Sequence, residues 1–297
     1  MHKQRFNVLK MEFELKPRGP LLVKSGTISP NPSLPDMQFV RTRTPEGEKV
    51  FIPGSSLKGV FRSFTEKVLR TMDKDLACDP FKKNGEDRAC GQKLKDEENA
   101  AKIYKESCHA CKIYGNTRLR GRLSFTDFMP QGEVITETRY GVAISRLTNA
   151  VAFGPFDMEV ILAGTFTGHL ILENFETWQV GIIGLTLRAM EEGLVRVGFG
   201  KNRGFGEVTM PPVRVTVEMA KPSPIPPQEI WGVGMFMKET DTASYGFHEE
   251  YRITGLPEGK EEDLGIYVRR EYTGEEWSAM AEKAIACLGN LRGGKKP

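Results

Sequence analysis

Hydrophobic and polar residues alternate along the start of the chain. Over residues 6–15 (FNVLKMEFEL) apolar side chains recur largely at every second position, which predicts a β-strand with one buried face. After a turn that contains Pro53 and Gly54 the spacing changes to three and four residues, which predicts a helix with Ser55 or Ser56 as its N-cap. The apolar face of this helix consists of Leu57, Val60, Phe61, Phe64 and Val68.

The rest of the chain supplies the other elements of an α+β fold. These are a strand at 120–125, a hairpin or extended projection at 133–154, a strand pair within 156–172, a helix at 174–192, and a glycine-rich turn at 197–208 that enters a last strand. Asn174 is the expected cap of the second helix, and Gly193 ends it. The order strand, helix, strand, strand, helix, strand predicts a ferredoxin-like βαββαβ sandwich.

Two segments lie outside this core pattern. Residues 73–107 are polar and weakly periodic, which is typical of an insertion, and residues 222–227 (PSPIPP) form a linker-like break. We therefore expect a domain at 1–216 and a C-terminal appendage at 217–297.

The charge distribution changes the picture of an ordinary globular composition. The chain carries 42 Lys+Arg and 39 Asp+Glu, a net charge of +3, but residues 217–297 hold 10 Lys+Arg and 14 Asp+Glu, a net of −4. The first 216 residues therefore carry +7, an asymmetry that favours a polyanion-binding body with an acidic appendage. Apolar runs are too short for a membrane span, and residues 1–16 lack the apolar core of a signal peptide. We expect a cytoplasmic protein without a membrane partner.

Two motifs carry basic residues at glycine-containing turns. In residues 52–62 a Gly-Ser-Ser turn opens the first helix, and Lys58 and Arg62 follow one turn apart, as a phosphate clamp requires. The alternative is a capped helix with two solvated cations. In residues 198–206 (GFGKNRGFG) four glycines alternate with Lys201, Arg203 and two phenylalanines that could offer stacking faces to RNA. The alternative there is a plain hairpin turn.

Together these motifs resemble the RAMP superfamily of CRISPR effector proteins, in the family's order over residues 6–216. Residues 108–127 (CHACKIYGNTRLRGRLSFTD) extend the match, and residues 139–160 (RYGVAISRLTNAVAFGPFDMEV) look like the thumb hairpin of type III backbone subunits. The resemblance implies an RNA-recognition-motif-like core that binds CRISPR guide RNA, with a thumb hairpin at 131–155 that enters the guide–target duplex.

The resemblance also implies which residues contact RNA. The expected guide contacts are Ser55, Ser56, Lys58, Arg62, Gly198, Gly200, Lys201, Arg203 and Gly204. In the thumb hairpin, Arg139 and Arg146 would contact the RNA backbone, with Ile144 or Leu147 as an apolar wedge; an ordinary surface hairpin is the alternative.

Four of the five cysteines lie within residues 74–115, in the polar segment or directly after it. Cys108 and Cys111 form a C-x-x-C pair, and Cys78 and Cys90 lie upstream. Four thiolates suit tetrahedral structural zinc, which would stabilise an insertion at 74–115 that lacks its own apolar core. No thioredoxin-like pattern surrounds the pair, which disfavours a redox role, and reduced unligated thiols are the other alternative. Whether His109 replaces one cysteine stays open.

The candidate catalytic residue rests on the resemblance. Family members cut RNA with an aspartate in the loop after the first strand, and Asp36 is the sole acidic residue between Glu14 and Glu46. It could bind Mg²⁺ or Mn²⁺ or orient the attacking 2′-hydroxyl. Elsewhere a lone carboxylate in a proline-stiffened loop is usually a solvated turn residue.

We therefore predict an endoribonuclease subunit of a type III CRISPR ribonucleoprotein, which binds guide RNA, cleaves paired target RNA and assembles with other RAMP subunits. The first alternative is a non-catalytic guide-RNA scaffold. A guide-processing endonuclease and a stand-alone zinc-dependent RNA-binding protein are further alternatives.

Overall fold

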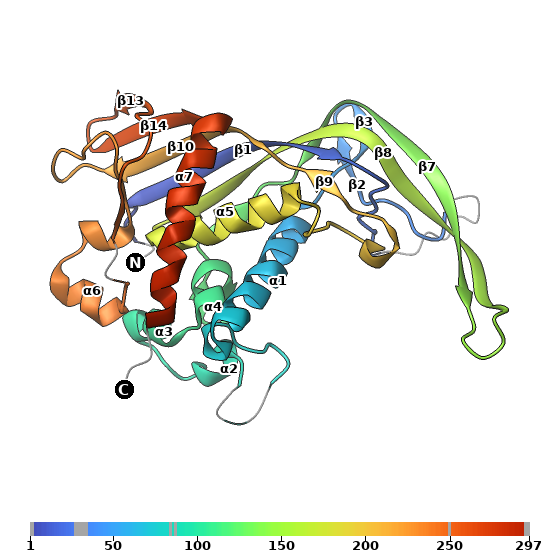
Figure 1. The fold of residues 1–297 in the computed structure, drawn as a ribbon, viewed down its shortest axis with the longest axis horizontal. Coiled ribbons are helices and arrows are strands. Elements are labelled where there is room, and N and C mark those ends of the chain that lie inside the picture. Colours follow the sequence, from blue (N-terminus) through green and yellow to red (C-terminus); the bar gives the residue numbers. More distant parts are fainter. Residues whose placement is uncertain (1–2, 27–34, 83–84, 86–87, 249–250, 294–297) are drawn as a thin grey trace.

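The computed structural model describes residues 3–26, 35–82, 85, 88–248 and 251–293. Its centre is an antiparallel sheet in the strand order β13-β14-β10-β1-β8-β6, with β7 paired to β8 and β9 paired to β1. These strands are β1 (Asn7–Pro17), β6 (Leu123–Phe125), β7 (Met129–Ile144), β8 (Val151–Glu173), β9 (Val208–Thr209), β10 (Pro212–Ala220), β13 (Lys260–Asp263) and β14 (Tyr267–Thr273). The helices α1 (Gly54–Met72), α5 (Thr177–Glu191) and α7 (Gly274–Ala286) lie on one side of the sheet (Figure 1).

The predicted ferredoxin-like core is confirmed. The elements β1, α1, β6, β8, α5 and β10 follow one another as βαββαβ, and their strands lie in the order β10-β1-β8-β6. Strand β1 lies between β10 and β8 in the sheet. Its alternate residues Leu9, Met11, Phe13 and Leu15 are all buried in the core.

Helix α1 begins earlier than its sequence suggests. Pro53 is the N-cap, so Ser55 and Ser56 lie in the first turn and neither is the cap. The first backbone N–H, that of Gly54, donates to Oδ1 of Asp127 at 2.9 Å, so a carboxylate from another segment caps the helix.

Helix α5 also differs from its expected start. Asn174 is not its cap: its backbone has a φ of 50°, and its side chain accepts a hydrogen bond from the N–H of Phe6. Glu176 caps the helix instead, and its N–H donates to Oε1 of Gln179. Most of α5 is buried because α7 packs on it; at the crossing a Cβ on Gly181 would lie 2.3 Å from the carbonyl oxygen of Ala284.

Short elements form the cysteine-rich insertion between α1 and β6. They are η1 (Lys74–Leu76), α2 (Cys90–Lys93), α3 (Ala100–Glu106), α4 (His109–Tyr114), β4 (Gly115–Asn116) and β5 (Leu119–Arg120). The two-stranded ribbon of β2 (Arg41–Thr44) and β3 (Gly47–Val50) precedes α1. The expected hairpin forms from β7 and β8, which pair from Met129↔Thr167 out to Ile144↔Val151 and extend away from the body (Figure 1). Residues 156–172 do not form the expected strand pair, because they all lie in the single long strand β8.

The C-terminal segment continues the central sheet. Strand β10 runs across residues 216 and 217, pairs with β1 on one side, and pairs with β14 on the other. The remaining elements are β11 (Ile230–Trp231), η3 (Val233–Phe236), α6 (Glu239–Tyr245), β12 (Arg252–Ile253) and η4 (Cys287–Gly293). Among the described residues, no helix is long and apolar enough to cross a membrane.

Candidate metal centre and nucleic-acid interface

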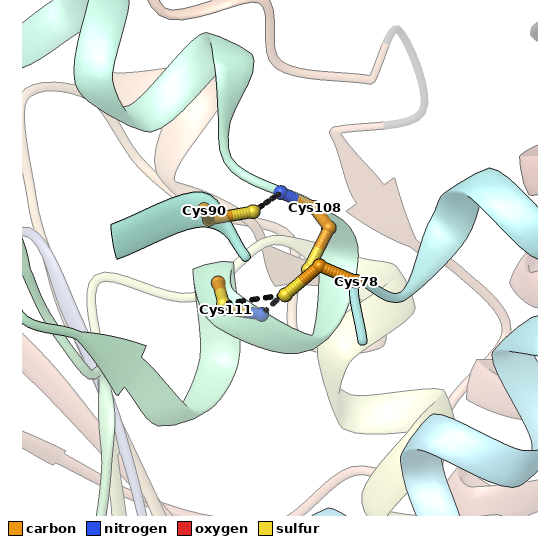
Figure 2. A group of neighbouring side chains, drawn as sticks. All are labelled: Cys78, Cys90, Cys108 and Cys111. Atoms are coloured by element: carbon orange, nitrogen blue, oxygen red, sulfur yellow. Dashed lines mark hydrogen bonds between the residues drawn. The ribbon is translucent and has the colours of Figure 1, made fainter. Parts of the chain in front are cut away.

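The structure brings Cys78, Cys90, Cys108 and Cys111 together, and we call them the cysteine cluster. They come from three separate pieces of the insertion, the segment after η1, α2, and the start of α4 (Figure 2). All four sulfur atoms lie within 4.8 Å of one another, and Sγ of Cys78 lies 3.8 Å from Sγ of Cys111.

These distances fit a metal rather than a disulfide. Four sulfurs at about 2.3 Å from a tetrahedral Zn²⁺ are about 3.8 Å apart, whereas disulfide sulfurs are about 2.0 Å apart. Backbone donors already point at two of the sulfurs: the Cys108 N–H donates to Sγ of Cys90 at 3.2 Å, and the Cys111 N–H donates to Sγ of Cys108 at 3.4 Å. The cluster can therefore bind a metal ion such as zinc.

Thiolate character is unevenly shared within the cluster. Hydrogen bonds from neighbouring thiols, that of Cys108 foremost, lower the pKa of Cys78, and a bond from Cys111 lowers the pKa of Cys108 to about 7. The same bonds, again with Cys108 foremost, raise the pKa of Cys90 and of Cys111. A cation at the centre would favour the thiolate form of all four, so metal binding releases protons.

His109 is not part of the group of potential ligands that the four cysteines form. Its Nε2 lies 2.9 Å from Nε2 of His248, and its ring packs edge-on against Trp178 at 5.1 Å between centroids. Burial lowers the pKa of His109, and the charges of Lys112 and His248 lower it further. The four cysteines thus complete a ligand set without this histidine. His109 instead connects the insertion to the C-terminal segment through His248.

The two predicted cations of α1, Lys58 and Arg62, differ in their contacts, because Arg62 is paired with a carboxylate through hydrogen bonds. Lys58 is half-buried, and burial followed by the charge of Arg62 lowers its pKa. The Arg62 guanidinium pairs with Glu66 (Nε to Oε1, 2.8 Å) and donates to the carbonyl oxygen of Gly115 at 3.3 Å. Ser55 is exposed and Ser56 half-buried at the helix start, where the N–H of Ser56 donates to the carbonyl oxygen of Pro53.

The glycine loop, residues 198–206, contains the short helix η2 (Lys201–Arg203) between Gly200 and Gly204, which have φ values of 72° and 81°. Gly198 lets this loop approach the neighbouring chain, because a Cβ there would lie 2.2 Å from the carbonyl oxygen of Leu22. Lys201 and Arg203 are exposed. Burial of the Lys201 ammonium, followed by repulsion from Lys67 on α1, lowers its pKa.

The base of the thumb hairpin lies against the glycine loop. The Arg139 guanidinium sits over the ring of Phe205 at 6.0 Å from its centroid. Phe205 is itself buried, so its ring supports Arg139 and is not open to a base. Further out, Arg146 is exposed, and Ile144 and Leu147 are 63% and 95% exposed. Exposed apolar side chains at this tip are what an inserted wedge requires.

Asp36 is exposed and lies where β8 enters the hairpin. Its N–H donates to Oδ1 of Asp157 at 2.7 Å, and the N–H of Asp157 donates to Oδ2 of Asp36 at 3.3 Å. The next residue continues the contact, because the N–H of Met37 donates to the carbonyl oxygen of Asp157 at 3.1 Å and the two strands are parallel there.

Three residues at these sites were not singled out by sequence reasoning. Asp127 caps α1, Asp157 binds the Asp36 segment, and Lys67 lies close enough to Lys201 to repel it. Only Asp127 could have been identified from the sequence, because it is a carboxylate directly after a predicted strand. The other two contacts join segments whose proximity depends on the sheet topology.

A sequence model of the RAMP superfamily matches residues 14–209. The chain belongs to the RAMP superfamily. This membership makes it a CRISPR-associated RNA-binding protein. The match runs from the last residues of β1 to the end of β9 and includes the cysteine cluster and the thumb hairpin. No curated protein matches the chain at a significant level.

Proposed function

We propose that this RAMP protein is a backbone subunit of a type III CRISPR effector that binds guide RNA and cleaves paired target RNA. The observation that carries the proposal is the contact of Arg139 with Phe205, because it sets the thumb hairpin beside the glycine loop. A guide strand held by the loop would then pass the base of the thumb, while the exposed tip reaches into the duplex.

Electrostatics supports the guide-binding part of the proposal. Lys58 is half-buried beside Arg62, and the exposed Lys201 lies near Lys67. Desolvation of each ammonium group, followed by repulsion from the neighbouring cation, lowers the pKa of both lysines. A phosphate placed between such cations removes the repulsion, so a polyanion is the ligand class that these positions favour. Ser55, Ser56 and the loop glycines would let the RNA backbone approach closely.

Guide binding can be measured with the full chain and a single-stranded RNA that carries a CRISPR repeat. We expect Lys201→Ala to weaken binding and to reduce the steepness of its salt dependence by about one phosphate contact. Lys260→Ala, which removes an exposed cation on the distant edge strand β13, is the matched control. Equal affinity and equal salt dependence in both variants would contradict the loop assignment.

The second part of the proposal is cleavage of the target RNA. Asp36 would bind Mg²⁺ or Mn²⁺ or orient the 2′-hydroxyl of the target. The position of Asp36 beside the entry to the thumb hairpin supports this role, because a wedge splays the paired nucleotide nearby. The test is cleavage of matched target RNA by the assembled complex, wild type against Asp36→Ala. Loss in the variant supports the role; cutting by neither protein identifies a guide-RNA scaffold.

We also propose that the cysteine cluster binds structural zinc. Four thiolates fill a tetrahedral site, so no position is left for a substrate, and the metal would hold together three pieces of the insertion. The metal content of the purified chain tests this proposal, with Cys111→Ser as the variant that loses zinc. Cys287→Ser is the matched control, since that thiol lies outside the cluster.

A further inference from the structure

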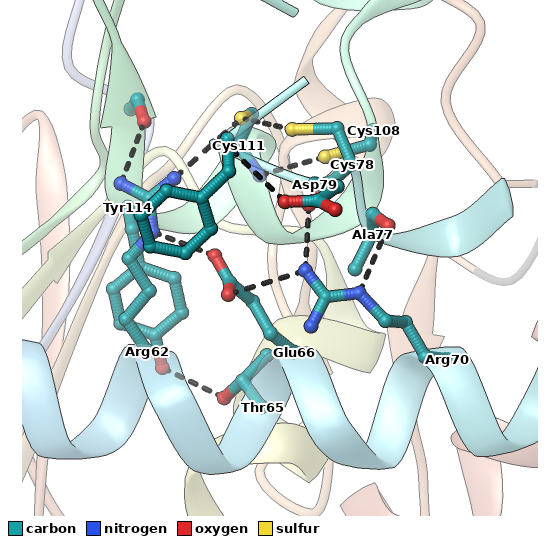
Figure 3. A network of polar contacts seen from close by, with 12 residues as sticks. Arg62, Thr65, Glu66, Arg70, Ala77, Cys78, Asp79, Cys108, Cys111 and Tyr114 are labelled. Atoms are coloured by element: carbon teal, nitrogen blue, oxygen red, sulfur yellow. Dashed lines mark hydrogen bonds and ion pairs between the residues drawn. The ribbon is translucent and has the colours of Figure 1, made fainter. Parts of the chain in front are cut away.

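One face of α1 forms a wall of the cysteine cluster. Arg62, Glu66 and Arg70 follow one another at four-residue steps along this face (Figure 3). Glu66 links the two arginines, because its Oε1 pairs with Nε of Arg62 at 2.8 Å and its Oε2 pairs with Nη2 of Arg70 at 3.4 Å. The carboxylate thereby fixes the direction of both guanidinium groups.

The two arginines contact different parts of the cluster. Arg70 holds the chain that carries Cys78, donating to the carbonyl oxygen of Cys78 at 2.6 Å and to that of Ala77 at 3.3 Å. Arg62 reaches a ligand atom itself: its Nη2 donates to Sγ of Cys111 at 3.9 Å. Its Nη1 donates to the carbonyl oxygen of Gly115, just after the helix that carries Cys111.

A filled site needs a cation at this position. Four thiolates around Zn²⁺ leave two negative charges uncompensated, and a buried net charge is costly unless a partner neutralises it. Among the described residues, Arg62 is the cation that donates a hydrogen bond to a sulfur of the cysteine cluster. Lys112 is buried nearby, but the charge of Glu176 acts on it more strongly than those of Cys108 and Cys90.

We propose that Arg62 is an outer-shell residue of this metal site, where it donates a charge-assisted N–H···S bond to Cys111 and neutralises part of the thiolate charge. The inference rests on the proposed zinc site. It gives Arg62 a second role beside the expected guide contact, and it makes the RNA-facing helix α1 part of the metal centre. Arginine suits the position because its planar fork can bind sulfur, carboxylate and carbonyl at once.

The test is zinc affinity of the full chain, measured by competition with a chelator of known affinity. We expect Arg62→Gln to weaken zinc binding by about 10- to 100-fold, the usual effect of losing an outer-shell partner. Arg62→Lys should fall between wild type and Arg62→Gln, because it keeps the charge and loses the fork. Lys260→Gln removes an exposed cation from β13, away from the cysteine cluster, and should bind zinc as wild type does.

A spectroscopic measurement separates direct contact from general destabilisation. With Co²⁺ in place of Zn²⁺, the thiolate-to-metal charge-transfer band should shift in Arg62→Gln and not in Lys260→Gln, because an N–H···S bond changes the donor strength of the thiolate. Wild-type affinity in Arg62→Gln, or weaker binding with an unshifted band, would overturn the proposal. If Arg62→Gln does not fold, Arg62→Lys is judged by the same two criteria. Absence of zinc binding by the wild type refutes the zinc site itself.

Discussion

Asp36 and Asp157 bind each other's backbone. The N–H of Asp36 donates to the Asp157 carboxylate at 2.7 Å, and the N–H of Asp157 donates to the Asp36 carboxylate at 3.3 Å. One residue follows the first strand and the other lies in β8 where it enters the thumb hairpin. The proposed catalytic loop is therefore fastened to the thumb, and a displacement of the thumb would move Asp36.

Asp157 should consequently position Asp36 for cleavage. We expect Asp157→Ala to reduce target cleavage by up to about 100-fold, because the Asp36 N–H loses its acceptor and small misplacements are costly to alignment. Asp157→Asn keeps an acceptor oxygen and should cut at close to the wild-type rate. The rates are measured in single-turnover reactions of the assembled complex, with Asp241→Ala on α6 as control. An Asn variant as impaired as the Ala variant would show that the charge of Asp157, not its acceptor, matters.

The ion pair of Arg41 with Glu159 fixes the same segment and makes it sensitive to acid. Burial alone would raise the pKa of Glu159, but hydrogen bonds from Arg41 and from the Phe39 N–H outweigh it, so the pKa lies below 4.5. A lowered folded-state pKa contributes stability above the unfolded value, and this stability is lost as pH falls through the folded value.

We therefore expect Glu159→Gln to be less stable than wild type at pH 6, and the difference to shrink as pH falls below about 4.5. Urea unfolding midpoints across this range give the measurement. A difference that does not change with pH would contradict the role of the ionised carboxylate.

Two helix glycines should respond in opposite ways to replacement by alanine, because Gly181 lies at the close crossing of α5 and α7 and Gly59 faces open space on α1. Gly181→Ala should destabilise the protein by about 1–3 kcal/mol, because the new Cβ would lie 2.3 Å from the carbonyl oxygen of Ala284. Gly59→Ala, at an exposed position of α1 with no heavy atom within 4 Å, should stabilise it by about 0.5–1 kcal/mol. Thermal unfolding distinguishes them, and a similar shift in both would argue against tight packing at Gly181.

The cap of α1 by Asp127 can be tested by Asp127→Ala. We expect a loss of about 1 kcal/mol in unfolding free energy, since the Gly54 N–H at the helix start loses its acceptor. Asp127→Asn should recover most of the loss, because asparagine is also a good capping residue. An unchanged stability in the Ala variant would mean that water replaces the carboxylate at no cost.

The sequence by itself determined the elements and their order. Alternation over residues 6–15 and the three- and four-residue spacing from Leu57 onward are local signals, and β1 and α1 appear where they predict. Four cysteines in a largely polar segment also indicated a shared site, because four thiolates suit tetrahedral zinc, and the structure brings their sulfur atoms together. Helix starts were misplaced at Ser55 and Asn174, since the actual caps depend on Asp127 from another segment and on the capping box of Glu176.

Tertiary structure decided which side chains meet. The contacts of Asp36 with Asp157, Arg139 with Phe205, and Arg62 with Cys111 join residues that are 49 to 121 positions apart in the chain. No local pattern encodes such a pair, because proximity follows from how β8 lies beside β1 and how the insertion folds onto α1. The sequence identified the chemical groups, and the packing of the sheet and helices set their distances.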